Sequence, residues 1–173
     1  NDANCFALGE KHFGKANKYK NCVALSLGTG LGMGIIIENK LYSGVLCGAG
    51  ELGMLSYKDG ILEQYTGSFF FEDAYGTSAK TLYAKALEND MKAIAAFKEY
   101  GMHLGEAIKN ILYLFAPEAI ILGGSISKAH PLFTAVLDDA LKTFAYQKQL
   151  ENFKIEISDL VDSPILGAAA LFL

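Results

Sequence analysis

The segment from Gly28 to Gly34 has a glycine at every second position, with Thr29 after the first. Because glycine has no Cβ, such a loop can bring several backbone N–H groups close to an anion such as a phosphate. A dinucleotide-binding fold would need these glycines to open a helix, and a P-loop would end in Gly-Lys-Ser/Thr. Neither pattern is present. Two alternatives remain: a hairpin turn that binds phosphate through its amides, or a tight hairpin whose glycines serve packing.

The surrounding residues predict the elements that position this segment. Alternating apolar residues predict a half-buried strand over 23–27, and a second strand is expected over 35–37. A turn at 38–40 leads to a third strand at 41–42, so the glycines lie inside a hairpin. A helix is predicted from Ala3 to about His12, with Asp2 near its N-terminus.

The rest of the chain alternates helices and strands. Residues 48–67 are expected to be mostly loop, and 68–87 to form one or two helices. The clearest helix is predicted over 91–115, where apolar residues recur at steps of three and four until Pro117. Four more elements are predicted: a strand at 119–122, a helix at 131–144, a strand at 154–157 and a helix at 164–173. A meander followed by alternation is typical of an α/β fold with a mixed sheet.

Composition narrows the class of protein. The 173 residues are 51% hydrophobic and 20% charged, which is typical of a compact domain or one lobe of a larger protein. A net charge of -4 without any basic run argues against nucleic-acid binding through this region, and no apolar run reaches the roughly 20 residues of a membrane span. The cysteines, Cys5, Cys22 and Cys47, form no C-x-x-C pair, so we expect buried free thiols in a cytoplasmic protein.

Five segments along the chain carry a resemblance to a known family: Asn1-Asp2-Ala3-Asn4, Gly28–Gly34, Ala49-Gly50-Glu51-Leu52-Gly53, Pro117–Gly124 and Leu166-Gly167-Ala168-Ala169. In this order they resemble segments of the ROK family of bacterial sugar kinases and sugar-responsive repressors. The first is similar to the family's catalytic stretch, the second to a phosphate loop, the third to a sugar-binding segment, the fourth to an adenosine-side strand and turn, and the last to a closing helix.

The resemblance implies that residues 1–173 are the C-terminal lobe of an actin/hexokinase-like (ribonuclease H-like) ATPase, a mixed sheet flanked by helices. The implied activity is glucokinase-like, the ATP-dependent phosphorylation of a hexose hydroxyl. The family's first phosphate loop would lie before Asn1, so we expect an N-terminal region to be missing and the isolated chain to be inactive. Two alternatives are the sugar-sensing domain of a ROK-type repressor and a non-catalytic ATPase-fold partner protein.

The same resemblance assigns roles to the matching residues. Asp2 would be the base that accepts the proton of the sugar hydroxyl, and the retained Asn1-Asp2 pair favours the kinase over the repressor. Asn1, Glu51 and Glu63 would bind the hydroxyls of a hexose or N-acetylhexosamine substrate. The alternative for each glutamate is an ordinary surface carboxylate.

ATP and Mg²⁺ are the implied cofactors, with Mg²⁺ bound largely through the missing N-terminal part. The phosphates would be held by Gly28, Thr29, Gly30 and Gly32. At the end of a strand, Gly123 and Gly124 would let the nucleotide approach the backbone. We also expect a homodimer and no membrane partner.

Two departures from the family pattern affect the site. Met54 stands where members usually have a His after the glycine that matches Gly53. The family's cysteine-rich zinc loop is replaced by Ser56–Ile61, which contains no cysteine. We therefore expect no structural zinc and no other metal site in this chain. Gly101 and Gly105 lie within the long predicted helix, where close helix packing is expected.

Overall fold

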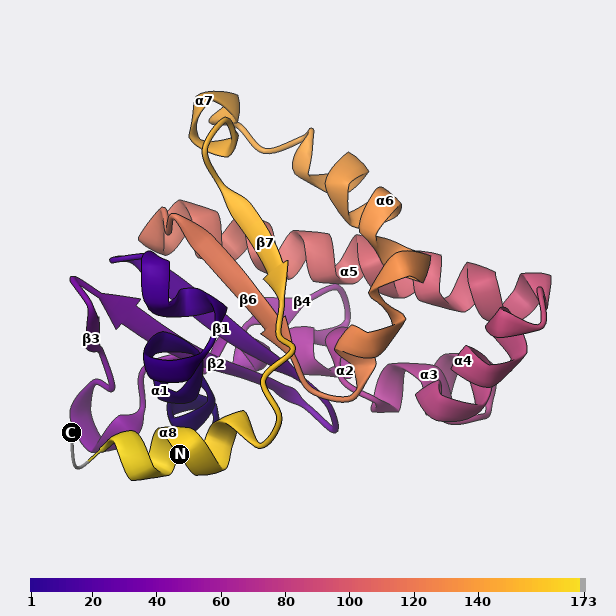
Figure 1. The fold of residues 1–173 in the computed structure, drawn as a ribbon. Helices are drawn as coiled ribbons and strands as arrows, with labels where there is room; N and C mark the ends of the chain where they lie inside the picture. Colours follow the sequence, from indigo (N-terminus) through magenta and orange to yellow (C-terminus); the bar gives the residue numbers. More distant parts are fainter. Residues whose placement is uncertain (172–173) are drawn as a thin grey trace.

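The computed structural model of the chain describes residues 1–171 (Figure 1). Short 3₁₀ turns at Lys15–Lys18, Val45–Cys47, Leu52–Met54 and Ile126–Ala129 connect some of the regular elements. The helices and strands are, in chain order, α1 (Asp2–Phe13), β1 (Cys22–Leu27), β2 (Leu31–Ile37), β3 (Lys40–Leu41), β4 (Ser56–Tyr57), β5 (Gly60–Ile61), α2 (Leu62–Thr66), α3 (Phe69–Tyr75), α4 (Ala79–Leu87), α5 (Met91–Phe115), β6 (Ala119–Gly123), α6 (His130–Leu141), α7 (Gln147–Leu150), β7 (Lys154–Ile157) and α8 (Ser163–Ala170).

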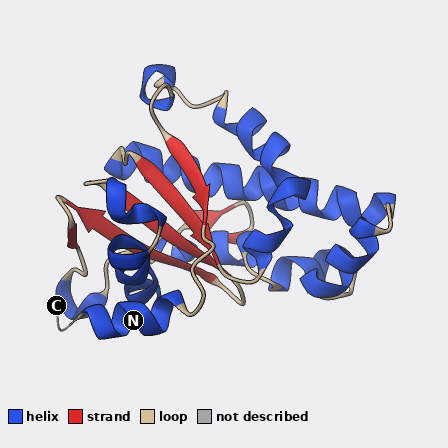
Figure 2. Ribbon diagram, in the orientation of Figure 1, coloured by secondary structure: helices blue, strands red, loops and turns tan. Residues whose placement is uncertain are grey.

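Five strands form one mixed sheet in the order β3-β2-β1-β6-β7 (Figure 2). β1 pairs antiparallel with β2 and parallel with β6, which in turn pairs parallel with β7. The predicted meander followed by alternating helices and strands is confirmed. β4 and β5 form a separate two-stranded hairpin.

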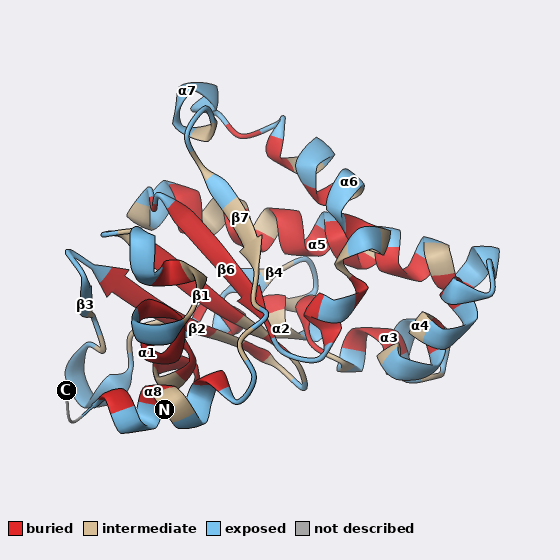
Figure 3. Cartoon of the chain, in the orientation of Figure 1, coloured by how far each residue is buried: buried red, intermediate tan, exposed pale blue. Residues whose placement is uncertain are grey.

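Both faces of the central strand β1 are covered (Figure 3). Val23 and Leu25 belong to a large core that includes the apolar face of α5, whereas Cys22 and Ala24 pack with Phe6 of α1. The alternating pattern predicted a half-buried strand, and that was wrong because small residues on the second face also pack against a helix. Figure 1 shows α1 and α8 together on one side of the sheet.

Helix α5 has the predicted bounds. Its N-terminus is capped by Asp90, whose carboxylate accepts hydrogen bonds from the amides of Lys92 and Ala93, each at 2.9 Å. It ends at Phe115, because Ala116 adopts the left-handed conformation and Pro117 follows.

The two glycines of α5 permit close contact with α6, as predicted. A Cβ at Gly101 would lie 2.9 Å from the Cβ of Phe133, and one at Gly105 would lie 2.6 Å from the Cβ of Ala140. Any larger side chain would separate the two helices.

Other predictions were partly wrong. The segment 48–67 contains the β4–β5 hairpin and α2, and β2 begins at Leu31 rather than 35. In contrast, the prediction of one or two helices over 68–87 is confirmed, since two helices form there, separated at Gly76, which has a φ of 68°. The last helix begins at Ser163, and the final two residues of its predicted range lie outside the described residues.

The cysteines differ in exposure. Cys22 is buried, but Cys5 is half-buried and Cys47 is exposed, so the prediction of buried thiols holds for only one of them. Among the helices of residues 1–171, none combines the length and the apolar character that a membrane crossing requires.

Candidate functional site

Gly28, Thr29 and Gly30 form the turn between β1 and β2, named here the glycine loop. The Ser68 amide donates to the carbonyl oxygens of Gly28 and Thr29, at 2.9 and 3.1 Å. Within residues 1–171, the amides of Thr29 and Gly30 donate no hydrogen bond. The Thr29 side chain is exposed. With its carbonyls engaged and two amides available, the loop has the donor set that suits an anion.

Gly32 and Gly34 lie within β2 rather than in the loop, contrary to the sequence prediction. A Cβ on Gly32 would lie 3.0 Å from the Cβ of Ala3, and one on Gly34 would lie 2.5 Å from the carbonyl oxygen of Ala3. These two glycines let α1 pack closely on the sheet. The packing alternative is thus confirmed for Gly32 and Gly34, whereas phosphate binding by Gly28, Thr29 and Gly30 stays a prediction.

The N-terminus of α1 presents Asn1 and Asp2. Asn1 is the N-cap, and its Oδ1 accepts hydrogen bonds from the amides of Ala3 at 2.9 Å and Asn4 at 3.2 Å. Asp2 is the first helical residue and is exposed, with Oδ1 2.9 Å from the Ala3 amide. The cap is thus made by Asn1, and within residues 1–171 the second carboxylate oxygen of Asp2 accepts from no group.

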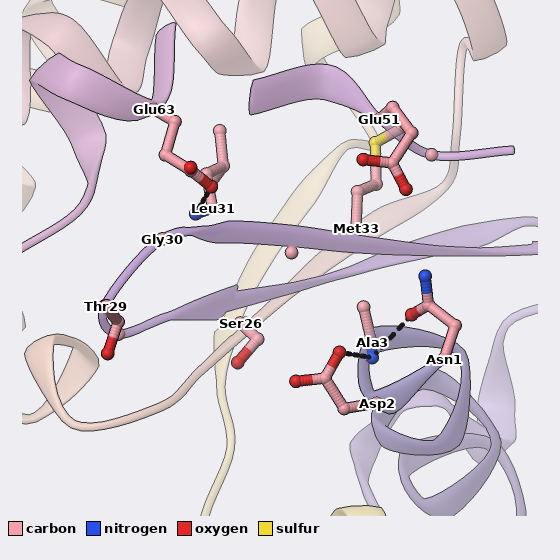
Figure 4. Close-up of a pocket in the computed structure, with 13 residues that line it drawn as sticks. Asn1, Asp2, Ala3, Ser26, Thr29, Gly30, Leu31, Met33, Glu51 and Glu63 are labelled. Carbon is pink, nitrogen blue, oxygen red and sulfur yellow. Dashed lines mark hydrogen bonds between the residues drawn. The ribbon is translucent and has the colours of Figure 1, made fainter. Parts of the chain in front are cut away.

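A pocket of about 310 Å³ brings the predicted polar residues together, and we name it the edge pocket. Its lining includes Asn1, Asp2, Glu51 and Glu63 together with the whole glycine loop. In Figure 4, Glu51 and Glu63 lie above β2, and Asn1 and Asp2 lie below it. The pocket follows a stretch of β2 that β3 does not cover, since β3 pairs only with Ile36 and Ile37.

The two glutamates reach the edge pocket in different ways. Glu51 is exposed and follows Gly50, whose φ of 95° suits glycine and brings the chain against the carbonyl of Met33. Glu63 is half-buried on α2, and its Oε2 accepts a hydrogen bond of 3.0 Å from the Leu31 amide. Only Glu63 is tied to the sheet.

A second pocket of about 520 Å³, the strand-end pocket, lies at the end of β6 and is lined by Gly123 and Gly124. Gly124 has a φ of 86°, and a Cβ there would collide with the Leu27 carbonyl. A Cβ on Gly123 would collide with the ring of Phe6. Both glycines thus line the pocket, and close packing also requires glycine at both positions.

Sequence reasoning missed two parts of this arrangement. Ser26 lines both pockets and lies between Gly32 and Gly123 in the sheet. The available signal was the alternation along this strand: Ser26 stands between the inward-facing Leu25 and Leu27, so its side chain points to the other face of the sheet. The segment 158–164, after β7, lines the strand-end pocket and carries no motif that would have shown it.

No three His, Cys, Asp or Glu side chains within residues 1–171 gather closely enough to ligate a metal ion.

Comparison with known proteins identifies relatives of two kinds. The xylose repressor of Bacillus subtilis (strain 168) is 30% identical over 99% of this chain and 49% of its own length. The glucokinase of Thermotoga maritima is 28% identical over 99% of this chain and 64% of its own length. The chain thus spans about half to two thirds of the curated relatives it matches.

A solved structure gives the fold. The ROK family glucokinase from Streptomyces griseus, in complex with glucose and AMPPNP, superposes with a TM-score of 0.82 at 26% identity, covering 99% of this chain and 66% of that one. The chain has the actin/hexokinase-like fold, as predicted. The ROK family model matches residues 1–173, and the chain therefore belongs to the ROK family.

Proposed function

We propose that residues 1–173 form the C-terminal lobe of a two-lobe, ATP-dependent hexose kinase of the glucokinase type. One observation carries the proposal: the edge pocket places Asp2, Asn1 and two glutamates beside a glycine loop with available amides. A hydroxyl-binding group, a proton acceptor and anion donors are what phosphoryl transfer to a sugar requires. The relatives that extend beyond this chain support a second lobe.

Each residue has a definite task in this proposal. ATP, when bound with Mg²⁺, supplies the γ-phosphoryl group and its charge neutralisation. The sugar hydroxyl oxygen bonds to the γ-phosphorus as the bond to the β-phosphate oxygen breaks, and the free carboxylate oxygen of Asp2 takes the hydroxyl proton. Because Oδ1 of Asn1 is used by the helix cap, its Nδ2 is the atom available to donate to a neighbouring hydroxyl. Glu51 accepts from another hydroxyl.

The nucleotide would run from the glycine loop to the strand-end pocket. The amides of Thr29 and Gly30 fit a phosphate, and Ser26 borders both pockets. The left-handed turn at Gly124 brings backbone to the pocket wall.

The second candidate is the sugar-sensing domain of a repressor. The 30% identity to a xylose repressor favours it, since this is slightly above the identity to the glucokinase of Thermotoga maritima. A sensing domain would use the edge pocket for sugar and would need no proton acceptor.

The deciding experiment uses the full-length protein with a panel of hexoses, N-acetylhexosamines and xylose. Kinase function predicts sugar-phosphate formation that depends on ATP and Mg²⁺. Sugar binding without turnover, together with sugar-sensitive binding to the promoter DNA of neighbouring genes, would establish the repressor instead. The isolated chain is expected to show no turnover, and activity near that of the full-length protein would contradict the two-lobe proposal.

A further inference from the structure

Helix α2 and the residues that follow it hold the glycine loop in place. The Ser68 amide binds the carbonyls of Gly28 and Thr29, and Oε2 of Glu63 binds the Leu31 amide at 3.0 Å. These contacts secure the loop on both sides of its free amides. A loop held in this way needs little reordering when it binds an anion.

The atoms around these hydrogen bonds are closely packed, so that α2 and the glycine loop have little room to move relative to each other. A Cβ on Gly30 would collide with the carboxylate of Glu63, and one on Gly67 would lie 2.5 Å from the carbonyl oxygen of Thr29. A Cβ on Gly53 would lie 3.1 Å from the Cβ of Glu63. Glycines on three segments therefore let α2 approach the loop.

Helix α2 is itself fixed to the core. Leu62 and Thr66 are fully buried, and the hydroxyl of Tyr100 in α5 donates to the Thr66 carbonyl at 2.9 Å. The position of Glu63 is thus set by the long helix rather than by a free surface loop.

We propose that Glu63 is a positioning residue that orders the phosphate-binding amides while its carboxylate borders the sugar side of the edge pocket. Its Oε2 accepts from the Leu31 amide, whereas its Oε1 accepts from no group within residues 1–171 and is the oxygen more readily available to a hydroxyl. One side chain would then join the two halves of the reaction site: sugar binding at Oε1 and nucleotide binding through the loop held by Oε2. This inference rests on the proposed kinase function.

Two matched variants of the full-length protein separate this role from simple sugar binding. In Glu63→Gln, the amide oxygen can still accept from Leu31, but the negative charge is lost. In Glu63→Asp, the negative charge remains, but the side chain is shorter, so its carboxylate no longer reaches the Leu31 amide. Affinity for AMPPNP, measured by calorimetry without sugar, reports on the loop alone. Hydrogen exchange of the Leu31 amide, measured without any ligand, reports on the hydrogen bond between Glu63 and Leu31.

We expect Glu63→Asp to weaken AMPPNP binding about tenfold and to accelerate Leu31 exchange by at least about tenfold, as for loss of one charge-assisted hydrogen bond. Glu63→Gln should stay within about threefold of wild type in both and should raise the sugar KM. Ser68→Pro removes the other amide donor at a compatible φ of -64° and should also weaken AMPPNP binding. Circular dichroism checks that each variant folds.

Equal AMPPNP affinity and equal Leu31 exchange in all three Glu63 proteins would overturn the positioning role and leave Glu63 as a sugar ligand only. Wild-type protein that binds no nucleotide would instead refute the proposed function. In that case Leu31 exchange still decides whether Glu63 orders the loop, so the two failures are distinguishable.

Discussion

The hydroxyl of Tyr57 and Nδ1 of His103 are joined by a hydrogen bond of 3.0 Å, which ties the β4–β5 hairpin to α5. The rings of Tyr65 and Phe70 pack on the same imidazole, with centroids at 5.0 and 5.3 Å. This aromatic cluster (Tyr57, Tyr65, Phe70 and His103) anchors the hairpin in the segment where the ROK pattern led us to look for a zinc loop. Packing and one hydrogen bond can fix a short hairpin without a metal.

Purified protein is therefore expected to contain much less than one zinc per chain. The physical reason is that the described residues gather no ligand set, and the hairpin carries no cysteine. Elemental analysis before and after dialysis against a chelator measures this, and the melting temperature should not change on chelation. Stoichiometric zinc that resists the chelator would contradict the prediction.

The free energy of unfolding should fall as the pH is lowered through the range in which His103 takes up a proton in the unfolded state. Burial lowers the pKa of His103, and the nearby Lys58 lowers it further, while Glu99 and Glu106 act in the opposite direction. The unfolded state therefore binds a proton near pH 6.5, before the folded state does. The stabilising contribution is present above about pH 6.5 and is lost as the pH falls from there towards the folded-state pKa.

Thermal melts at pH 7.5 and 5.5 test this. The wild-type melting temperature should fall more between these two values than that of His103→Gln, which has no imidazole to protonate. His12→Gln, whose parent side chain is exposed, is the matched control and should behave like wild type. Parallel pH profiles for wild type and His103→Gln would show that another group governs the pH dependence.

Close packing of α5 on α6 predicts a strong coupling between Gly105 and Ala140. Alanine at 105 gains about 1 kcal/mol of helix propensity, but overpacking costs about 1–3 kcal/mol. Because the new Cβ would lie 2.6 Å from that of Ala140, we expect Gly105→Ala to destabilise the protein by about 1 kcal/mol. Ala140→Gly alone should also destabilise it.

The double variant supplies the control. With the Ala140 methyl removed, the methyl of Gly105→Ala has room, so the two changes should be less destabilising together than their sum, by about 1 kcal/mol or more. Denaturant unfolding of the four proteins gives this coupling. Additive effects would show that the helices separate freely at this point.

Periodicity predicted the parts of the fold where burial governs local structure. Helix α5 was predicted with its correct bounds from its apolar spacing and from Pro117, and the structure shows that the Asp90 cap also fixes its start. The β4–β5 hairpin and α2 were missed, because they are short and depend on contacts far along the chain, such as that of Tyr57 with His103. Local sequence does not encode such contacts.

The residues of the candidate site were found by motif, but their arrangement was not. The sequence could not distinguish Gly30, in the loop, from Gly32, in the strand, because both follow the same spacing. It could not show that Glu63 binds the Leu31 amide, since the two residues are brought together only by the packing of α2. The role of each group as base or ligand remains a prediction.

The strongest test of chemistry is Asp2→Asn in the full-length protein. Asparagine keeps the size of the side chain and an oxygen that can accept from the Ala3 amide, as Oδ1 of Asp2 does at 2.9 Å. It cannot accept the hydroxyl proton. Since a positioned general base contributes about 10²–10⁴-fold, kcat should fall by that factor while sugar affinity changes little. The assay is steady-state phosphorylation of the best sugar at saturating ATP and Mg²⁺.

Glu51→Gln should have the opposite signature and chiefly raise the sugar KM, because a carboxylate that grips a hydroxyl acts in the ground state and the transition state alike. Glu88→Gln, at an exposed helix end far along the chain from either motif, is the matched control and should leave both constants unchanged. If Asp2→Asn retains more than about a third of the wild-type kcat, another group accepts the proton. The kinase proposal would then rest on the fold alone, and since one fold serves several functions, the sugar-sensing alternative would become the better one.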